Sequence, residues 1–118
     1  MNVEELIARS FCARDCAHIA HWQTKSFAEH EAFGAFYEGI IDLLDKFVEA
    51  YQGAFGIIGE IKYKEKDSKS AMNYLKGELA WLAKNREKIA KDVSPLENII
   101  DEILALYMTT LYKLENLK

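Results

Sequence analysis

Chain-breaking residues are scarce in this sequence, and their scarcity constrains the fold more than any other feature. The chain has one proline and six glycines in 118 residues. A β-sandwich or a β-barrel needs a turn signal about every 8–12 residues, and so few glycines and prolines cannot supply them. We therefore predict an all-α protein in which long helices are joined by a small number of connections.

Capping patterns predict where the helices begin. A short polar side chain followed three residues later by an acid satisfies the free N–H groups of a first helical turn. Three pairs have this spacing: Asn2 with Glu5, Ser26 with Glu29, and Ser94 with Glu97. Apolar residues that recur every three and four positions extend from these starts. Together the two signals predict helices over 3–25, 27–52, 69–91 and 95–117.

The segment 53–68 is the one long connection that the pattern predicts. Gly53, Gly56 and Gly59 interrupt the apolar period, and the mixed-charge run KYKEKDSK follows. The other two connections are short, which makes the helices that they join antiparallel neighbours. The expected architecture is a single domain, 1–118, that forms an antiparallel four-helix bundle. Its second and third helices are joined by a longer surface crossover, which is expected to cross the end of the bundle.

Charge and composition exclude several classes of protein. The net charge is −4, from 15 basic and 19 acidic residues, which disfavours a nucleic-acid partner because phosphate binding needs a dense basic surface. No apolar stretch approaches the ~20 residues that span a bilayer, and no secretory leader is recognisable. Cys12 and Cys16 have neither a zinc-ribbon nor a redox spacing. We therefore expect a cytoplasmic protein with reduced thiols.

The three histidines of the chain fall within thirteen positions. His18 and His21 are three residues apart and share one face of the first predicted helix. His30 lies one turn into the second predicted helix. An antiparallel pair of helices brings the end of one beside the start of the next, so the three rings are expected at one end of the pair.

A row of carboxylates follows on the second predicted helix. Its members, spaced four, three and four residues apart, are Glu38, Asp42, Asp45 and Glu49. They fall within about 60° of arc around the helix. Such a row is most often a solvated face, and a histidine on a helix is more often structural than a ligand. The combination nevertheless indicates a divalent-metal site, because metal sites in helical bundles are built from these side chains on facing helices.

A single helix cannot bring the histidine cluster and the far end of this row to one ion. Asp45 lies fifteen residues beyond His30, which is more than ~20 Å at a rise of 1.5 Å per residue. If both side chains bind one metal, Asp45 and Glu49 must come from a second subunit that runs antiparallel across a two-fold axis.

The stretch from His18 to Tyr51 resembles the Dps-type mini-ferritins of the ferritin-like superfamily. That family has His-Trp near the end of its first helix, then a Lys/Gly loop and Phe. His-Glu-x-Phe opens its second helix, and Asp-x-x-x-Glu follows further along. The corresponding residues here are His21-Trp22, Lys25, Phe27, His30-Glu31-Ala32-Phe33, and Asp45 with Glu49.

This resemblance implies an iron-binding protein. It implies that His21 and His30 of one subunit and Asp45 and Glu49 of another hold iron at a two-fold interface. The implied activity is that of a ferroxidase, which oxidises Fe(II) with peroxide or dioxygen. The family forms dodecameric cages, but the shorter chain and the short connection here favour a homodimer, with a larger homo-oligomer as the alternative.

One departure from the family pattern concerns the ligand set. Gly34 stands where the family has an acid, so one carboxylate is missing. Glu38, one turn later, and His18 are the candidate replacements. If the site has decayed, the alternative function is a non-enzymatic helical dimer, an interaction module on a ferritin-like fold.

The tryptophans, the aromatic residues of the last predicted helix and two helical glycines predict where side chains pack closely. Trp22 and Trp81 are expected in the core or at a dimer interface. Three helically spaced residues of the last helix are expected in the core: Tyr107, Met108 and Tyr112. Gly34 and Gly39 each cost a helix up to ~1 kcal/mol relative to alanine, which predicts the close approach of another backbone across a two-fold interface.

Overall fold

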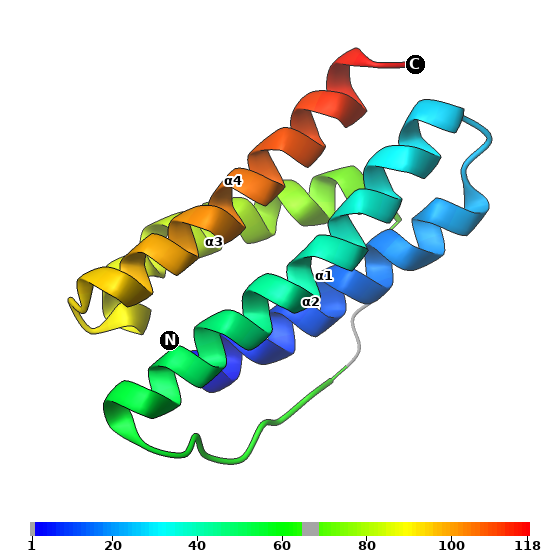
Figure 1. Cartoon of the computed structure of the whole chain (residues 1–118). Helices are drawn as coiled ribbons and strands as arrows, with labels where there is room; N and C mark the ends of the chain where they lie inside the picture. Colours follow the sequence, from blue (N-terminus) through cyan, green and yellow to red (C-terminus); the bar gives the residue numbers. More distant parts are fainter. Residues whose placement is uncertain (1, 65–68) are drawn as a thin grey trace.

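Four α-helices make up the fold, as the sequence predicts. The computed structural model describes residues 2–64 and 69–118, and within these ranges no strand is present. The helices are α1 (Val3–Gln23), α2 (Phe27–Phe55), α3 (Ala71–Ala90) and α4 (Ser94–Asn116) (Figure 1). The all-α prediction is confirmed, and each predicted end is correct to within three residues.

Capping residues set the exact ends of the helices, which the spacing of apolar residues predicts only approximately. α2 continues through Gly53 to Phe55, and its C-cap is Gly56, whose φ of +96° is a conformation that favours glycine. α3 begins later than predicted because Ser70 is its N-cap and accepts from the backbone N–H of Asn73. Asn2 and Ser26 cap α1 and α2 as predicted. Ser94 does not cap α4: the N-cap is Val93, and no side-chain cap bond is present.

The different roles of two serines give a test of helix capping. Ser26 Oγ accepts from the backbone N–H of Glu29 at 3.2 Å, so Ser26→Ala should lower the free energy of unfolding by about 1 kcal/mol. Ser94→Ala is the matched control and should change it by less than about 0.5 kcal/mol. Urea denaturation measures both. Equal losses in the two variants would contradict the assignment of the caps.

Every helix packs against two antiparallel neighbours (Figure 1). α1 contacts α2 and α3, and α4 contacts the same two helices. The rings of Phe36 on α2 and Tyr107 on α4 are 5.0 Å apart between centroids, and Arg86 on α3 pairs with Asp101 on α4. α2 and α3, which the long connection joins, therefore run parallel along a diagonal of the four-helix bundle.

The connection between α2 and α3 follows the outer side of α1. The backbone N–H of Gly59 donates to a Glu4 carboxylate oxygen at 2.9 Å, near the start of α1. The Tyr63 hydroxyl donates to Asp15 at 2.7 Å, three turns further along α1. The connection thus travels along the bundle instead of crossing its end as expected, because α3 begins beside the end of α1. Residues 65–68 of the predicted connection lie outside the described residues.

One apolar core lies between the four helices. Its largest fully buried side chains include Phe36, Phe47, Ile40, Leu75, Leu82, Ile100 and Ile103. Tyr107 is buried, as predicted. The prediction for Met108 and Tyr112 is wrong: they are 55% and 59% exposed. Their recurrence at helical spacing places them on one side of α4, but that side is not covered by a neighbouring helix.

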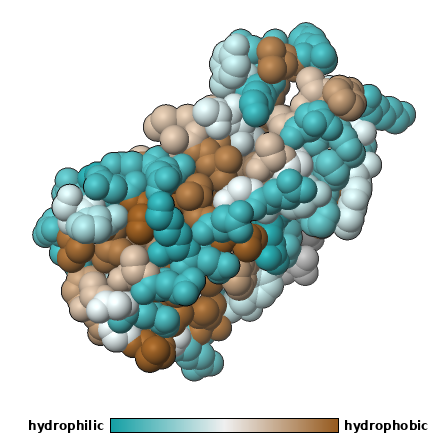
Figure 2. All heavy atoms as spheres, viewed as in Figure 1, coloured by the Kyte–Doolittle hydropathy of each residue, from teal (hydrophilic) through white to brown (hydrophobic). Residues whose placement is uncertain are grey.

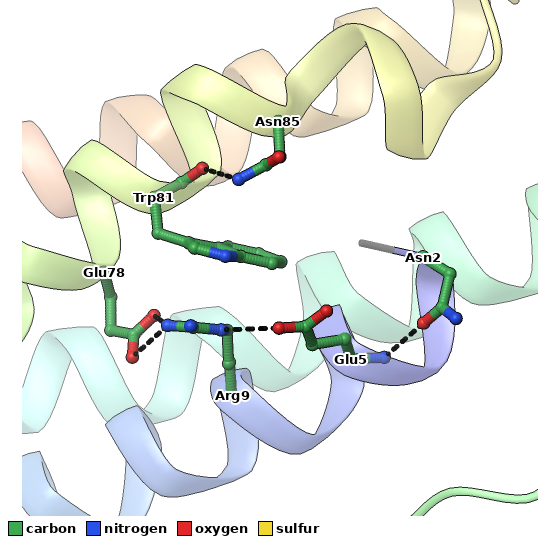
Figure 3. Close-up of polar contacts among 6 residues, drawn as sticks. All are labelled: Asn2, Glu5, Arg9, Glu78, Trp81 and Asn85. Carbon is green, nitrogen blue, oxygen red and sulfur yellow. Dashed lines mark hydrogen bonds and ion pairs between the residues drawn. The ribbon is translucent and has the colours of Figure 1, made fainter.

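An ion pair crosses the bundle between α1 and α3 (Figure 3). Arg9 Nη1 donates to both carboxylate oxygens of Glu78, at 3.1 and 2.9 Å, and Nε donates to Glu5 at 3.4 Å. The Arg9 guanidinium carbon lies 4.2 Å from the centre of the Trp81 ring. Glu78 is only 7% exposed. Burial raises the pKa of Tyr107 well above its ordinary value, and the nearby charge of Glu78 raises it further.

Both cysteines are free thiols, as expected. Cys12 is buried, and its Sγ donates to the carbonyl oxygen of Lys64 at 3.3 Å. Burial raises the pKa of the half-buried Cys16 thiol, and the neighbouring Cys12 adds to the shift. A raised pKa leaves less thiolate at neutral pH, so Cys16 does not have the environment of a reactive cysteine.

Candidate metal centre

The turn between α1 and α2 brings two of the predicted ligands into contact. His21 lies in the last turn of α1, and His30 lies in the first turn of α2. Their rings stack with centroids 3.6 Å apart and planes inclined by 20°. Both residues are half-buried. The short, capped turn at Ser26 fixes the relative position of the two helix ends and therefore of the two rings.

Two reciprocal hydrogen bonds orient these rings. His21 Nδ1 lies 2.6 Å from the carbonyl oxygen of His30, and His30 Nδ1 lies 2.9 Å from the carbonyl oxygen of His21. A carbonyl oxygen can only accept, so Nδ1 carries the hydrogen in both rings. In a neutral imidazole the lone pair is then on Nε2, which is the atom that a metal requires. Backbone carbonyls commonly orient metal-binding histidines in this way.

Gly34 provides the space that the His21 ring occupies. A Cβ atom at this position would lie 3.2 Å from both Cε1 and Nδ1 of His21. A Cβ atom at Gly39 would lie 3.4 Å from the side chain of Leu106. Close approach was predicted at both glycines, but the neighbours here are side chains of the same chain, not the backbone of a second subunit.

His18, the third histidine, stacks between two aromatic rings. Its centroid is 4.0 Å from that of Tyr37, with the planes inclined by 15°, and 4.2 Å from that of Trp22. Its separation from the His21 ring is 6.3 Å. Trp22 is 68% exposed, so it does not lie in the core, which was one of the two places expected for it. Trp81 is half-buried beneath Arg9.

The predicted carboxylate ligands divide into two groups. Glu38 lines the same open depression as the stacked rings, a hollow of about 290 Å³ whose other lining residues are Glu31, Gly34, Ala35 and Tyr37. Asp45 and Glu49 are exposed and lie much further along α2. Because α2 is one continuous helix, its fifteen-residue separation places Asp45 about 22 Å from the level of His30.

A single chain does not assemble the six predicted ligands. In residues 2–64 and 69–118, no group of three or more His, Cys, Asp or Glu side chains lies close enough together to hold a metal ion. One chain places Glu38 on the lining of the same open depression as the histidine pair, and it places Asp45 and Glu49 further along α2. Sequence reasoning did not identify Tyr37 as a neighbour of these rings, although its spacing of seven from His30 places it on the same helix face.

None of the four described helices is a candidate membrane span. Within the part of the chain that the structure describes, no helix has the length and apolar character needed to cross a bilayer. A cytoplasmic location stays a prediction.

Comparison with known proteins places the chain in a family. A family model described as a family of unknown function, DUF5856, matches residues 21–114. This range is well over half of the chain. The chain belongs to DUF5856. The DUF5856 range begins at His21 and contains His30, Glu38, Asp45 and Glu49, whereas His18 precedes it.

One curated relative of this DUF5856 chain is a phage protein. It is the uncharacterized 14.6 kDa protein in the mobD-ri intergenic region of Enterobacteria phage T4, 36% identical over 55 residues. The matched segment covers 47% of this chain and 43% of the phage protein, so the match spans less than half of that relative. No solved structure matches the chain.

Proposed function

We propose that this DUF5856 protein binds iron between two copies of the chain, on a ferritin-like bundle. His21 and His30 of one copy provide the nitrogen ligands, and Asp45 and Glu49 of the other provide the carboxylates. Glu38 and His18, which lie near the histidine pair, are secondary candidates.

The reciprocal Nδ1–carbonyl bonds of His21 and His30 are the observation that carries this proposal. They hold both rings in the tautomer that leaves Nε2 available, before any metal arrives. A ligand pair oriented in advance loses less freedom on binding. Neutral imidazole with carboxylate oxygen is also a donor set that suits iron.

The exposure of the distant carboxylates supports the participation of a second copy. Asp45 and Glu49 are exposed, so another molecule can reach them. A two-fold axis that crosses α2 midway between His30 and Asp45 would place the carboxylates of one copy at the level of the histidines of the other. Each dimer would then hold two equivalent sites.

The topology supports the ferritin-like part of the proposal. Bundles of that type have a single long crossover among otherwise short connections. Here the connection along α1 makes α2 and α3 parallel, while both helix hairpins are joined by short turns.

Iron would be the substrate of the reaction. With hydrogen peroxide as oxidant, two Fe(II) ions lose one electron each while the O–O bond breaks, and two protons are consumed: 2 Fe(II) + H₂O₂ + 2 H⁺ gives 2 Fe(III) + 2 H₂O. The chain contributes the ligands that hold iron and the carboxylates that balance its charge.

Gly34 favours a second candidate function, the non-enzymatic dimer. The His21 ring fills the space where a side chain would begin at this position, so the carboxylate that the mini-ferritin pattern has there is absent. A dimer that has lost a ligand would bind iron weakly or would not oxidise it.

Anaerobic Fe(II) titration of protein whose solution mass is known tests the proposal. We expect saturation at one or two irons per chain, followed by an absorbance change when peroxide is added. Saturable binding without that change would favour the non-enzymatic dimer. A folded helical protein that binds no iron would overturn the metal site.

A further inference from the structure

A small hollow lies where the connection after α2 passes beside α1 and the start of α3. Its volume is about 170 Å³. Bonds from the connection to Glu4 and Asp15 hold it against the outer side of α1 (Figure 1). We call this space the α1–α3 hollow, and it is lined by side chains of three segments: Glu5, Ala8, Arg9 and Cys12 of α1, Lys62 and Lys64 of the connection, and Tyr74 of α3. The residues that line the histidine depression take no part in it.

The hydroxyl group of Tyr74 is the unusual feature of this hollow. Its oxygen is buried, and among the described residues no group forms a hydrogen bond with it. The nearby Cys12 thiol already donates to the carbonyl oxygen of Lys64, and sulfur is a weak acceptor. Burial raises the pKa of Tyr74, and the charge of Glu78 raises it further, so the hydroxyl keeps its hydrogen at neutral pH. Because buried polar groups nearly always have a partner, this O–H indicates that the hollow receives a hydrogen-bond acceptor.

The charge of the hollow favours an acceptor that is negative. Arg9 spends its charge on two acids, because Nη1 donates to Glu78 and Nε donates to Glu5. Lys62 and Lys64 are exposed, and in the part of the chain that the structure describes neither has an ion-pair partner. With Glu78 counted, three positive side chains stand against two negative ones. One net positive charge therefore remains, and the two lysines carry it.

Acidic surfaces elsewhere limit an anion to this hollow. A second hollow adjoins it at Glu5 and is lined by Glu4 and Glu60, so its charge repels an anion. The exposed acids of α2 lie apart from both. Figure 2 shows hydrophilic surface running diagonally over α2, with apolar surface between it and α4, whereas the α1–α3 hollow is bounded by α1, the connection and α3.

We propose that the α1–α3 hollow binds a small oxyanion, a phosphate or a carboxylate. The Tyr74 hydroxyl donates to one of its oxygens, and the ammonium groups of Lys62 and Lys64 balance its charge. A hydrogen bond to a charged oxygen is roughly twice as strong as one between neutral groups. The volume agrees with this class of ligand. It equals that of about five waters at ~30 Å³ each, which suits the five heavy atoms of phosphate, whereas drug-sized ligands occupy pockets of ~300 Å³ or more.

Titration of the metal-free full chain, labelled with ¹⁵N, with inorganic phosphate tests this site. Sodium chloride keeps the ionic strength constant. We expect saturable shifts in the backbone amide signals of Arg9, Lys64 and Tyr74, and none at His21 or His30. A parallel titration with acetate shows which oxyanion the hollow prefers. Saturable binding of either supports the site, and binding of neither overturns it.

Two variants remove the groups that the proposal assigns to the ligand. Tyr74→Phe should keep the thermal midpoint of the protein without phosphate, because the hydroxyl has no partner among the described residues. It should raise the dissociation constant of phosphate on the order of tenfold or more. The double variant Lys62→Gln, Lys64→Gln should raise it similarly. Its matched control is Lys84→Gln, Lys88→Gln, which removes two exposed charges of α3 outside the hollow and should change the constant by less than about threefold.

The controls separate a built site from general attraction by charge. If Tyr74→Phe binds phosphate as tightly as the wild type, the hydroxyl does not hold the ligand and the proposal is wrong. Equal losses in the two double lysine variants would mean that phosphate responds only to the overall charge, which also overturns it. Because the titration contains no metal, its result is independent of whether the histidine pair binds iron.

Discussion

Replacement of Arg9 by alanine should lower the free energy of unfolding by about 3–5 kcal/mol, a large fraction of the stability of a domain this size. The change removes both hydrogen bonds to the buried Glu78 carboxylate and leaves its charge unpaired between α1 and α3. It also removes the guanidinium that covers Trp81 (Figure 3). Urea denaturation monitored by circular dichroism gives the free energy directly.

A double variant separates the unpaired charge from the general loss of contacts. Arg9→Met with Glu78→Leu removes both charges and keeps most of the volume, so its stability should return to within about 1 kcal/mol of the wild type. Arg86→Ala is the control, because its pairs with Asp101 and Glu97 lie at the surface, where solvent screens an ion pair and its contribution to stability is small. If Arg9→Ala and Arg86→Ala cost the same, the pair with Glu78 does not have the assigned importance.

Loss of both histidines should abolish iron binding at the proposed site. The double variant His21→Ala, His30→Ala removes both nitrogen ligands together with the two bonds that orient them. Removing even an orienting partner costs about 10–100-fold in metal affinity, so we expect a loss of at least ~100-fold in anaerobic Fe(II) titrations. The helical circular dichroism spectrum should not change, because both rings lie outside the buried core.

Neighbouring carboxylates provide the matched control for the second half of the site. Asp45→Asn should lower Fe(II) affinity, whereas Asp42→Asn, one turn away on the same exposed face, should leave it within about threefold. Both changes remove one negative charge from α2. An equal effect in the two variants would mean that the acidic surface attracts iron only through its charge.

The sequence predicts the helices and their order because these depend on local patterns. Capping at Asn2 and Ser26 and the long interruption after α2 are all visible in short segments. Ser94 was misassigned because serine and proline are both common near a helix start, and Val93 takes the cap position instead. The packing of one helix against another depends on residues far apart in the sequence, so short segments do not show which face of a helix is covered. For this reason Met108 and Tyr112 were expected in the core.

The candidate site was predictable only in part for the same reason. The positions of His21 and His30 around a short turn indicate that their rings meet, and the length of α2 separates them from Asp45. The hydrogen bonds to backbone carbonyls depend on the detailed geometry of that turn. The pairing of Arg9 with Glu78 joins residues 69 positions apart, and no spacing rule predicts such a contact.

Mixing two defective chains tests the central claim, a metal site shared between copies. His30→Ala lacks a nitrogen ligand and Asp45→Asn lacks a carboxylate, so neither variant should bind Fe(II) tightly alone. After the two are unfolded and refolded together in equal amounts, half of the dimers contain one chain of each kind. One of the two sites in such a dimer is intact, so about one quarter of the wild-type tight sites should return. If mixing restores no tight Fe(II) binding, the site is not shared between two chains.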